Sequence, residues 1–280
     1  MLAIVLGLRL PAQVRPPGGL TLQTWNVGDV QRTALVAMPR NAVADAGAPL
    51  VLVFHGHGGT SAQAARSFGI HGAWPEALVV YPQGLPTAGQ ITDPEGRLPG
   101  WQHVPAGEGD RDLKFVDAML AWARKERRVD SARVFAAGHS NGGSMVYVLW
   151  AARAREFAAF APSSSVFRPD VVANATPKPA FIVAGQQDLL VPFRTQQLSL
   201  SRVLRLNQAA MAEQAWDGTA RLHTSKTGAD VVTYIHPGGH QLPADAGALM
   251  VKFFKAVRTT TALPWQSPAE SRGHRQIPER

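Results

Sequence analysis

Five short apolar runs alternate with helical patterns along this chain, and this alternation restricts the fold class. The runs are PLVLVFHG (49–56), ALVVYPQG (77–84), ARVFAAGHS (132–140), FAAFAPSS (157–164) and PAFIVAGQQD (179–188). Nearly continuous apolar runs of this length are typical of strands that are buried on both faces of a parallel sheet. Two further strands are expected over residues 20–27 and 32–38, and helical patterns cover residues 112–126, 141–154 and 193–211. The chain is therefore predicted to be α/β, with a mainly parallel central sheet flanked by helices.

The length of 280 residues suits one large domain with a substantial core. We expect this domain over residues 20–258. Residues 1–19 are expected to be a leader or a degraded export signal. Their apolar part has the length of a signal-peptide core, but it lacks a basic region in front and is interrupted by Arg9. Residues 259–280 are polar and contain proline, and we expect a flexible tail there.

Composition excludes several kinds of site and partner. No run of about 18 apolar residues is present, so we expect no membrane-spanning segment. The chain has no cysteine, which excludes disulfides, thiolate metal sites and a cysteine nucleophile. Its formal net charge is +8, but the basic residues are scattered and no basic run is interleaved with aromatic residues. We therefore expect a solvated basic surface and no nucleic-acid partner.

The stretch AGHSNGGSM (137–145) places Ser140 between Gly138 and Gly142, after a strand pattern and before a helical one. On a sharp strand-to-helix turn, glycines two residues before and after the serine leave room for the strand and the helix. The serine hydroxyl then points out of the sheet. The first amides of the following helix face the reactant that binds at that oxygen. This context predicts that Ser140 is a nucleophile; the alternative is a serine that only caps the helix.

A serine hydroxyl needs a general base, and the base needs a carboxylate to orient it. His240 lies in the Gly-rich stretch YIHPGGHQLP after a strand pattern, and Asp188 ends the last of the five apolar runs. Ligands of open α/β sheets bind beyond the carboxyl ends of the strands, so Ser140, Asp188 and His240 are predicted to meet at one edge. Their chain order is that of the α/β-hydrolases. Asp217 and Asp230 are weaker candidates for the acid, because they lie in a turn-rich stretch before the final strand.

The stretch VFHGHGGTSAQ (53–63) is a Gly-rich turn at the end of an inner strand, and such turns expose backbone N–H groups. The predicted oxyanion donors are the amides of His57 and of Asn141, the residue after the nucleophile. The alternative interpretation of HGH is a metal site. Neither HExxH nor a carboxylate cluster accompanies it, so no metal and no organic cofactor is predicted.

Two other histidines are expected to have structural roles. His139 adjoins Ser140, and its side chain should point away from the nucleophile. His236 alternates within a strand pattern and should be packed in the domain.

Residues 82–110 form a long segment that is rich in Pro and Gly, and loops of that length are usually functional or disordered. Trp101, Gln102 and His103 lie in it, after a strand whose carboxyl end should face the ligand. We therefore expect these three residues to contact substrate. The alternative for Trp101 is that it packs its own loop against the domain.

The chain resembles the LpqC-like polyhydroxybutyrate depolymerase and feruloyl esterase group of the α/β-hydrolases. The matching stretches are PLVLVFHGHGG, VVYPQG, GW at 100–101, DLKFVDAML, RVFAAGHSNGGSM, FAAFAPSSS, AGQQDLLVP and GGHQLP, over about residues 30–257. The resemblance implies a single-domain α/β-hydrolase fold and a Ser-Asp-His esterase, with Ser140, Asp188 and His240 in these roles. It also favours an extracellular or periplasmic location over a cytoplasmic one. The chain departs from the group in lacking the cysteines that many members carry, and His57 stands where some have cysteine.

The predicted function is a serine carboxylic-ester hydrolase that works through a covalent acyl-enzyme. Its expected partners are small-molecule or oligomeric esters, of the polyhydroxyalkanoate or feruloyl/aryl type that the resemblance implies. Two alternatives stay open at this point. One is a serine peptidase on the same fold, and the other is a binding protein that has a hydrolase fold and no catalytic activity.

Overall fold

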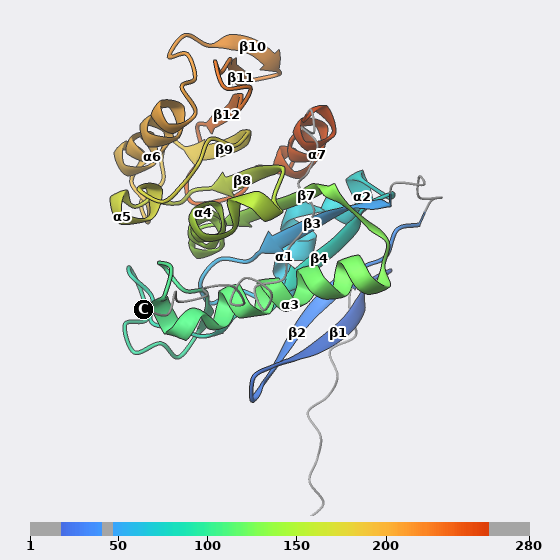
Figure 1. Ribbon diagram of the computed structural model, residues 1–280. Coiled ribbons are helices and arrows are strands. Elements are labelled where there is room, and N and C mark those ends of the chain that lie inside the picture. Colours follow the sequence, from blue (N-terminus) through green and yellow to red (C-terminus); the bar gives the residue numbers. More distant parts are fainter. Residues whose placement is uncertain (1–17, 41–46, 258–280) are drawn as a thin grey trace, which may run out of the picture.

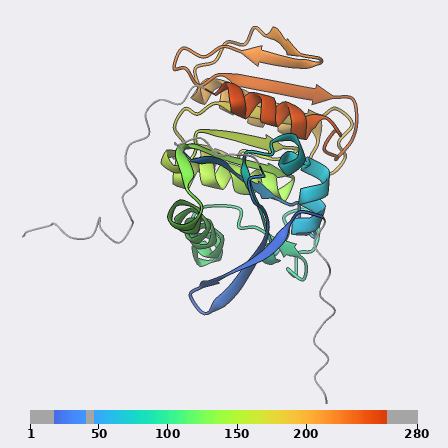
Figure 2. The ribbon, with the colours of Figure 1, turned by 90° about the vertical axis from the view of Figure 1, so that its right-hand side faces the viewer.

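The structure of the protein is a computed structural model, which describes residues 18–40 and 47–257 (Figure 1). Residues 1–17 of the predicted leader, and the whole predicted tail over 259–280, lie outside the described residues. One large twisted sheet runs through the described part, with helices on both of its faces (Figures 1 and 2).

The main sheet has ten strands in the order β1-β2-β4-β3-β7-β8-β9-β12-β11-β10. Their bounds are Thr21–Val27 (β1), Val30–Ala37 (β2), Leu78–Pro82 (β4), Ala48–Phe54 (β3), Val129–His139 (β7), Ala159–Ser163 (β8), Ala180–Gly185 (β9), Val231–His236 (β12), Ala220–His223 (β11) and Gln214–Asp217 (β10). The inner strands from β4 to β12 pair in parallel, and the outer pairs are antiparallel. The predicted mainly parallel central sheet is confirmed.

The five apolar runs of the sequence form β3, β4, β7, β8 and β9. Every residue of β3, β4, β8 and β9 is buried, because helices cover both faces of the sheet. One face carries α3 (Arg111–Glu126), α4 (Asn141–Arg153), α5 (Pro169–Val172) and α6 (Phe193–Leu206), and the other carries α1 (Ser61–Phe68), α2 (Ile70–Ala73) and α7 (Ala246–Ala256). Each face has its own apolar core.

The N-terminal strands β1 and β2, which were both predicted, pair as an antiparallel hairpin (blue in Figure 1). Gly28 occupies the turn with a φ of 59°, a left-handed conformation that glycine adopts without strain. β2 begins at Val30, two residues before the predicted start at 32.

The helix predicted over 193–211 ends earlier, at Leu206. The side chain of Asn207 donates to the backbone oxygens of Lys178 (2.7 Å) and Ala229 (2.9 Å). Gln208 then has a φ of 50°, which leaves the helical region. The helix therefore stops where Asn207 contacts distant parts of the chain.

The long segment over 82–110 is folded. It contains a two-stranded antiparallel pair, β5 (Leu85–Pro86) and β6 (Pro99–Gly100), and a 3₁₀ helix, η1 (Gly107–Asp110). A second 3₁₀ helix, η2 (Ala154–Glu156), follows α4.

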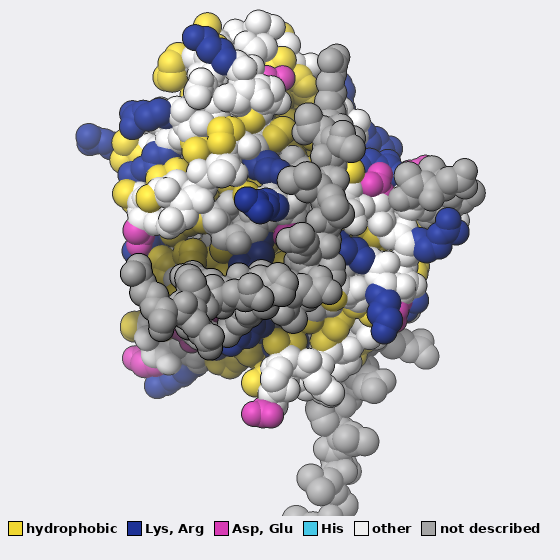
Figure 3. Space-filling view, viewed as in Figure 1, with side chains coloured by type: hydrophobic (Ala, Val, Ile, Leu, Met, Phe, Trp, Pro, Cys, Tyr) yellow, Lys and Arg dark blue, Asp and Glu magenta, His cyan; other side chains and the backbone are white. Residues whose placement is uncertain are grey.

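The surface agrees with the predicted scatter of basic residues. On the face shown in Figure 3, Lys and Arg side chains are spread among other residues and form no single patch. Within the described ranges, no helix has the length and apolar character that would suit a bilayer crossing.

Candidate active site

Ser140 lies on the sharp turn between β7 and α4, with φ 57° and ψ −124°. This backbone conformation is strained for a residue with a side chain. The flanking glycines are required by close packing. A Cβ atom on Gly138 would lie 2.3 Å from the backbone oxygen of Gly142, and one on Gly142 would lie 2.3 Å from that of Phe54. The strand–turn–helix context predicted for Ser140 is therefore present, and the turn exposes its side chain to a pocket.

Asp188 and His240 are in direct contact. The Nδ1 atom of His240 lies 2.7 Å from Oδ2 of Asp188, whose side chain has no exposed surface. Oδ1 of Asp188 accepts the backbone N–H groups of Leu190 (2.9 Å) and Val191 (2.8 Å). The Nε2 of Gln196 donates to Oδ2 (2.9 Å). The carboxylate is thus held by four donors, one of them the histidine.

The other acids considered from the sequence lie in different contacts. Asp217 pairs with Lys252 at 2.7 Å, with both side chains more than a third exposed. Asp230 accepts the backbone N–H of Ser225 at 2.7 Å. Of the three acids weighed, it is Asp188 that contacts His240.

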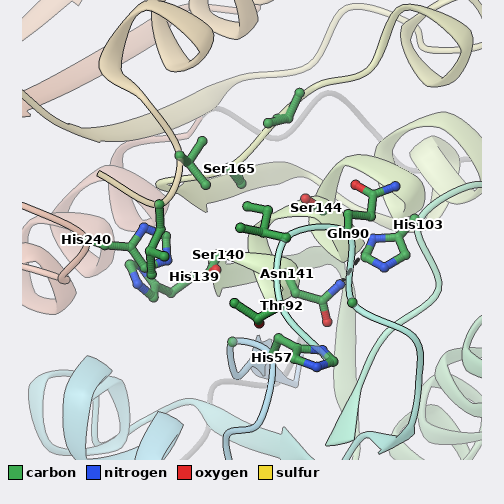
Figure 4. Close-up of a pocket in the computed structure, with 16 residues that line it drawn as sticks. His57, Gln90, Thr92, His103, His139, Ser140, Asn141, Ser144, Ser165 and His240 are labelled. Carbon is green, nitrogen blue, oxygen red and sulfur yellow. Dashed lines mark hydrogen bonds between the residues drawn. The ribbon is translucent and has the colours of Figure 1, made fainter. Parts of the chain in front are cut away.

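Ser140 and His240 line the same pocket, with a cavity volume of about 230 Å³ (Figure 4). Within residues 18–40 and 47–257, neither the hydroxyl of Ser140 nor Nε2 of His240 has a hydrogen-bond partner. Catalytic contacts are often open in the absence of substrate and tighten when it binds. Both groups are therefore free to interact with each other or with a ligand.

The HGHGG turn forms one wall of the pocket through Gly56 and His57. His55 holds this turn from behind: its Nδ1 lies 2.7 Å from the backbone oxygen of Gly56, and its Nε2 accepts the N–H of Gly84 at 3.0 Å. These partners require Nδ1 to carry the proton. Burial lowers the pKa of His55 to about 4, so the ring is neutral at pH 7.

The two amides predicted as oxyanion donors belong to residues that line the pocket, His57 and Asn141. In the part of the chain that the structure describes, neither backbone N–H is engaged in a hydrogen bond. Asn141 is the first residue of α4, where the N–H has no partner within the helix. Both donors are therefore available to an anionic oxygen in the pocket.

Trp101 does not wall the pocket, which corrects the expectation from the sequence. Its side chain is fully buried, and its indole N–H donates to the backbone oxygen of His55 at 2.8 Å. Its backbone pairs with the side chain of Asn141: the N–H donates to Oδ1 (2.8 Å), and the carbonyl accepts from Nδ2 (3.1 Å). The indole packs edge-on against Phe54 at 5.1 Å. These contacts fit the alternative role, in which Trp101 packs its own loop against the domain.

Gln102 is also buried and does not line the pocket, a second correction. Its Oε1 accepts the N–H groups of Asp112 (3.2 Å) and Leu113 (3.3 Å) at the start of α3. Its own N–H donates to the carboxylate of Asp112 at 2.8 Å. That carboxylate forms a buried ion pair with Arg32 at 2.8 Å. Gln102 therefore anchors the segment to the helix, because its polar groups are used inside the domain.

His103 does line the pocket (Figure 4). Its Nε2 lies 3.1 Å from the backbone oxygen of Ala88, and its Nδ1 lies 3.4 Å from Nδ2 of Asn141. Burial, the largest effect, lowers its pKa. A neutral ring with the proton on Nε2 satisfies both contacts.

His139 lies beside His240 and does not point away from the site as expected. It lines the pocket, and its ring centre is 4.8 Å from that of His240 (Figure 4). Burial, followed by the proximity of His240, lowers the pKa of His139 to about 4. The strand alternation could not reveal this, because the sharp turn at Ser140 breaks it. His236, in contrast, is buried as predicted.

Sequence reasoning did not single out the remaining walls of the pocket. They are formed by residues 89–92 of the long segment, by Ser144 of α4, by Ser165 and Val166 after β8, and by Leu190 and Val191. The last two directly follow Asp188, so their place beyond the end of β9 was a usable signal. Among the described residues, no group of three or more His, Asp or Glu is arranged to hold a metal ion.

Sequence comparison relates the chain to hydrolases. Residues 102–176 match a model of the Prolyl oligopeptidase family. NocK of Nocardia uniformis subsp. tsuyamanensis, which is named as a candidate esterase, is 30% identical over 193 residues, 65% of this chain and 53% of NocK. Feruloyl esterase C of Emericella nidulans is 41% identical over 66 residues, 24% of this chain and 23% of that protein. The chain thus spans about half the length of NocK and less of feruloyl esterase C.

Solved structures show the same architecture. The acetyl xylan esterase from Aspergillus awamori aligns with a TM-score of 0.62 at 17% identity, covering 84% of this chain and 99% of that one. A carboxylesterase of Bacillus cereus aligns with a TM-score of 0.56 at 17% identity, covering 81% of this chain and 95% of that one. The predicted α/β-hydrolase fold, and the resemblance to the esterase group of that fold, are confirmed.

Proposed function

We propose that this chain, which has the α/β-hydrolase fold of the esterases that it resembles, is a serine carboxylic-ester hydrolase. The observation that carries the proposal is the 2.7 Å contact between the buried Asp188 and His240, which lines the same pocket as Ser140. A histidine that donates its Nδ1 proton to a carboxylate keeps the lone pair of Nε2 free to act as a base. The strained turn keeps the hydroxyl of Ser140 at the pocket.

In the proposed reaction, Oγ of Ser140 attacks the ester carbonyl carbon while Nε2 of His240 takes the hydroxyl proton. The amides of His57 and Asn141 donate hydrogen bonds to the oxyanion. The carbon–oxygen bond to the alcohol then breaks, and the alcohol leaves with the proton from His240. A water molecule, deprotonated by His240, then attacks the acyl carbon. The bond from that carbon to Oγ of Ser140 breaks, Oγ takes the proton back from His240, and the acid leaves. Asp188 orients His240 and stabilises its charged form in both halves.

The proposed substrates are small or oligomeric esters, of the polyhydroxyalkanoate or feruloyl/aryl type. Two relatives named as esterases, feruloyl esterase C and acetyl xylan esterase, support this choice of reaction. The pocket of about 230 Å³ carries the aliphatic side chains of Ile91, Val166 and Leu190. Such a lining favours a small apolar group next to the scissile ester.

A serine peptidase is the second candidate, and the match of residues 102–176 to the Prolyl oligopeptidase family favours it. The same nucleophile, base and amides would serve amide hydrolysis, with the proton of His240 delivered to the leaving amine. A panel of 4-nitrophenyl esters beside a panel of peptide 4-nitroanilides separates the two activities.

The proposal is tested by labelling the folded protein with a fluorophosphonate probe, with Ser140→Ala as the control. We expect labelling of Ser140 alone and a loss of at least about 10³-fold in kcat in the variant. A folded wild-type protein that takes up no probe and hydrolyses no ester would instead support the binding-protein alternative.

A further inference from the structure

The loop between β5 and β6, residues 87–98, forms a pocket wall that the proposed reaction does not use. Gly89, Gln90, Ile91 and Thr92 of this β5–β6 loop line the pocket. Figure 4 shows Gln90 and Thr92 among the lining residues. Ile91 does so while 62% of its surface is exposed. A large aliphatic side chain in that position can contact a ligand group that extends beyond the cavity. The loop therefore meets whatever part of the substrate leaves the pocket on this side.

Asp93 organises the fold of this loop. Its Oδ1 accepts the N–H of Arg97 (3.0 Å), and its Oδ2 accepts the N–H of Leu98 (2.8 Å). Its backbone oxygen accepts the N–H groups of Gly89 (3.0 Å) and Gly96 (3.1 Å). The N–H of Leu98, followed by that of Arg97, holds the pKa of the Asp93 carboxyl below its ordinary value. The carboxylate thus closes the loop on itself.

His57 connects that loop to the HGHGG turn. Its Nε2 lies 3.1 Å from Oδ2 of Asp93, and the two side chains are only 12% and 9% exposed. The imidazole ring fits between two glycines. A Cβ atom on Gly89 would lie 3.1 Å from Nε2, and one on Gly100 would lie 2.8 Å from Nδ1. Gly89 of the loop and Gly100 of β6 thus leave the space for the ring, and Asp93 of the loop is its partner.

We propose that the β5–β6 loop determines which esters the pocket accepts, and that the contact between His57 and Asp93 holds it in place. This inference rests on the proposed esterase function. His57 then has two separate roles: its amide is a proposed oxyanion donor, and its side chain positions the loop that bears Ile91. The class of substrate selected is an ester whose acyl or alcohol part is larger than acetyl or vinyl and apolar, because the loop presents an aliphatic side chain.

The test measures selectivity in Asp93→Ala, with Glu95→Gln as the matched control. Glu95 is an exposed acid of the same loop, so its variant removes a charge without touching His57. The substrates are 4-nitrophenyl acetate with 4-nitrophenyl octanoate for the acyl side, and vinyl acetate with 1-naphthyl acetate for the alcohol side. In Asp93→Ala we expect kcat/KM for the larger member of at least one pair to fall by about tenfold or more, mainly through KM. The smaller member and the Glu95→Gln variant should change by less than about threefold.

Two further variants keep the result interpretable. Ile91→Ser leaves the hydrogen bonds of the loop intact and should reduce selectivity in the same pair of esters. His57→Phe keeps a ring between the glycines and removes the donor to Asp93, while Asp93 still accepts the N–H groups of Arg97 and Leu98. It should therefore reduce selectivity in the same pair of esters, but by less than Asp93→Ala does. Trypsin cleavage after Arg97 should become faster in Asp93→Ala, a readout that is independent of activity.

Equal losses for all four esters, or unchanged selectivity in both Asp93→Ala and Ile91→Ser, would overturn the inference. These outcomes differ from a failure of the proposed function. If the wild-type protein hydrolyses none of the four esters, the esterase proposal fails and the selectivity inference fails with it. If the wild type is active and only the ratios are unaffected, the esterase proposal stands and the loop inference is wrong.

Discussion

Asp188→Asn should lower kcat for a soluble ester by roughly 10⁴ while the domain stays folded. The reason is the set of partners around the carboxylate. Oδ1 accepts the N–H groups of Leu190 (2.9 Å) and Val191 (2.8 Å). Oδ2 lies 2.7 Å from Nδ1 of His240 and accepts from Nε2 of Gln196 at 2.9 Å. All four partners are donors, so the side chain at this position has to accept at both of its ends.

An asparagine cannot meet that requirement in either orientation. With its oxygen on the two backbone N–H groups, its NH₂ faces His240, which must then accept at Nδ1 and carry its proton on Nε2. That tautomer has no lone pair for the proton of Ser140. Gln196 cannot adapt by turning its amide, because its Nε2 also donates to the oxygen of Val191 (2.6 Å) and its Oε1 accepts the N–H of Gly185 (3.3 Å). The opposite orientation places the NH₂ against two backbone donors.

The expected loss of rate in Asp188→Asn is larger than its expected loss of folding stability. A loss of about 10⁴ corresponds to about 5.5 kcal/mol of transition-state stabilisation. One unsatisfied buried donor costs about 1–3 kcal/mol of folding free energy, which a domain of this size can tolerate. The assays are kcat for 4-nitrophenyl acetate, the rate of fluorophosphonate labelling, and a thermal melt followed by circular dichroism.

The control is Asp217→Asn, which changes an exposed acid that pairs with Lys252. We expect it to keep kcat within about threefold of the wild type. If Asp188→Asn keeps kcat within about tenfold, or if Asp217→Asn loses as much activity, then the acid has been assigned wrongly.

Other positions give predictions of a different kind. Trp101→Ala removes a fully buried ring, worth about 3–5 kcal/mol, and should lower Tm and the kcat of large and small esters together; a raised KM for bulky esters alone would return Trp101 to the pocket wall. Gly142→Ala places a Cβ 2.3 Å from the backbone oxygen of Phe54, and should yield little folded protein; normal expression with a wild-type melting curve would contradict the packing argument. Stability should fall as the pH drops from about 6.5 to 4, because burial lowers the pKa of His55 to about 4, whereas the unfolded chain binds that proton near 6.5. The free energy of unfolding should fall between pH 7.5 and pH 4.5 by about 2.5 kcal/mol less in His55→Gln than in the wild type, and equal falls would refute this origin.

The parts of the fold that depend on local sequence were predictable, and those that depend on distant contacts were not. Burial on both faces produces a continuous apolar run, so the inner strands could be placed. The tight turn at Ser140 needs glycine on both sides, which the sequence displays directly. The end of α6 depends on Asn207 bonding to residues 29 and 22 positions away, and no local pattern reports that. The position of His139 was missed because the sharp turn at Ser140 breaks the strand alternation, and because its neighbour His240 is remote in the sequence.

Trp101 shows how such distant contacts change the role inferred for a residue. In the sequence it lies in an irregular segment with no regular face to bury it, which favoured a place at the substrate. In the fold its backbone pairs with the side chain of Asn141, and its indole N–H donates to the carbonyl of His55. These contacts join the first residue of α4 to the HGHGG turn, the two segments that carry the proposed oxyanion donors. The separation of the amides of His57 and Asn141 therefore depends on Trp101, although Trp101 does not itself line the pocket. The long segment thus acts on the site from two sides: Trp101 fixes the two donor segments from behind, and residues 89–92 form the wall that faces the substrate.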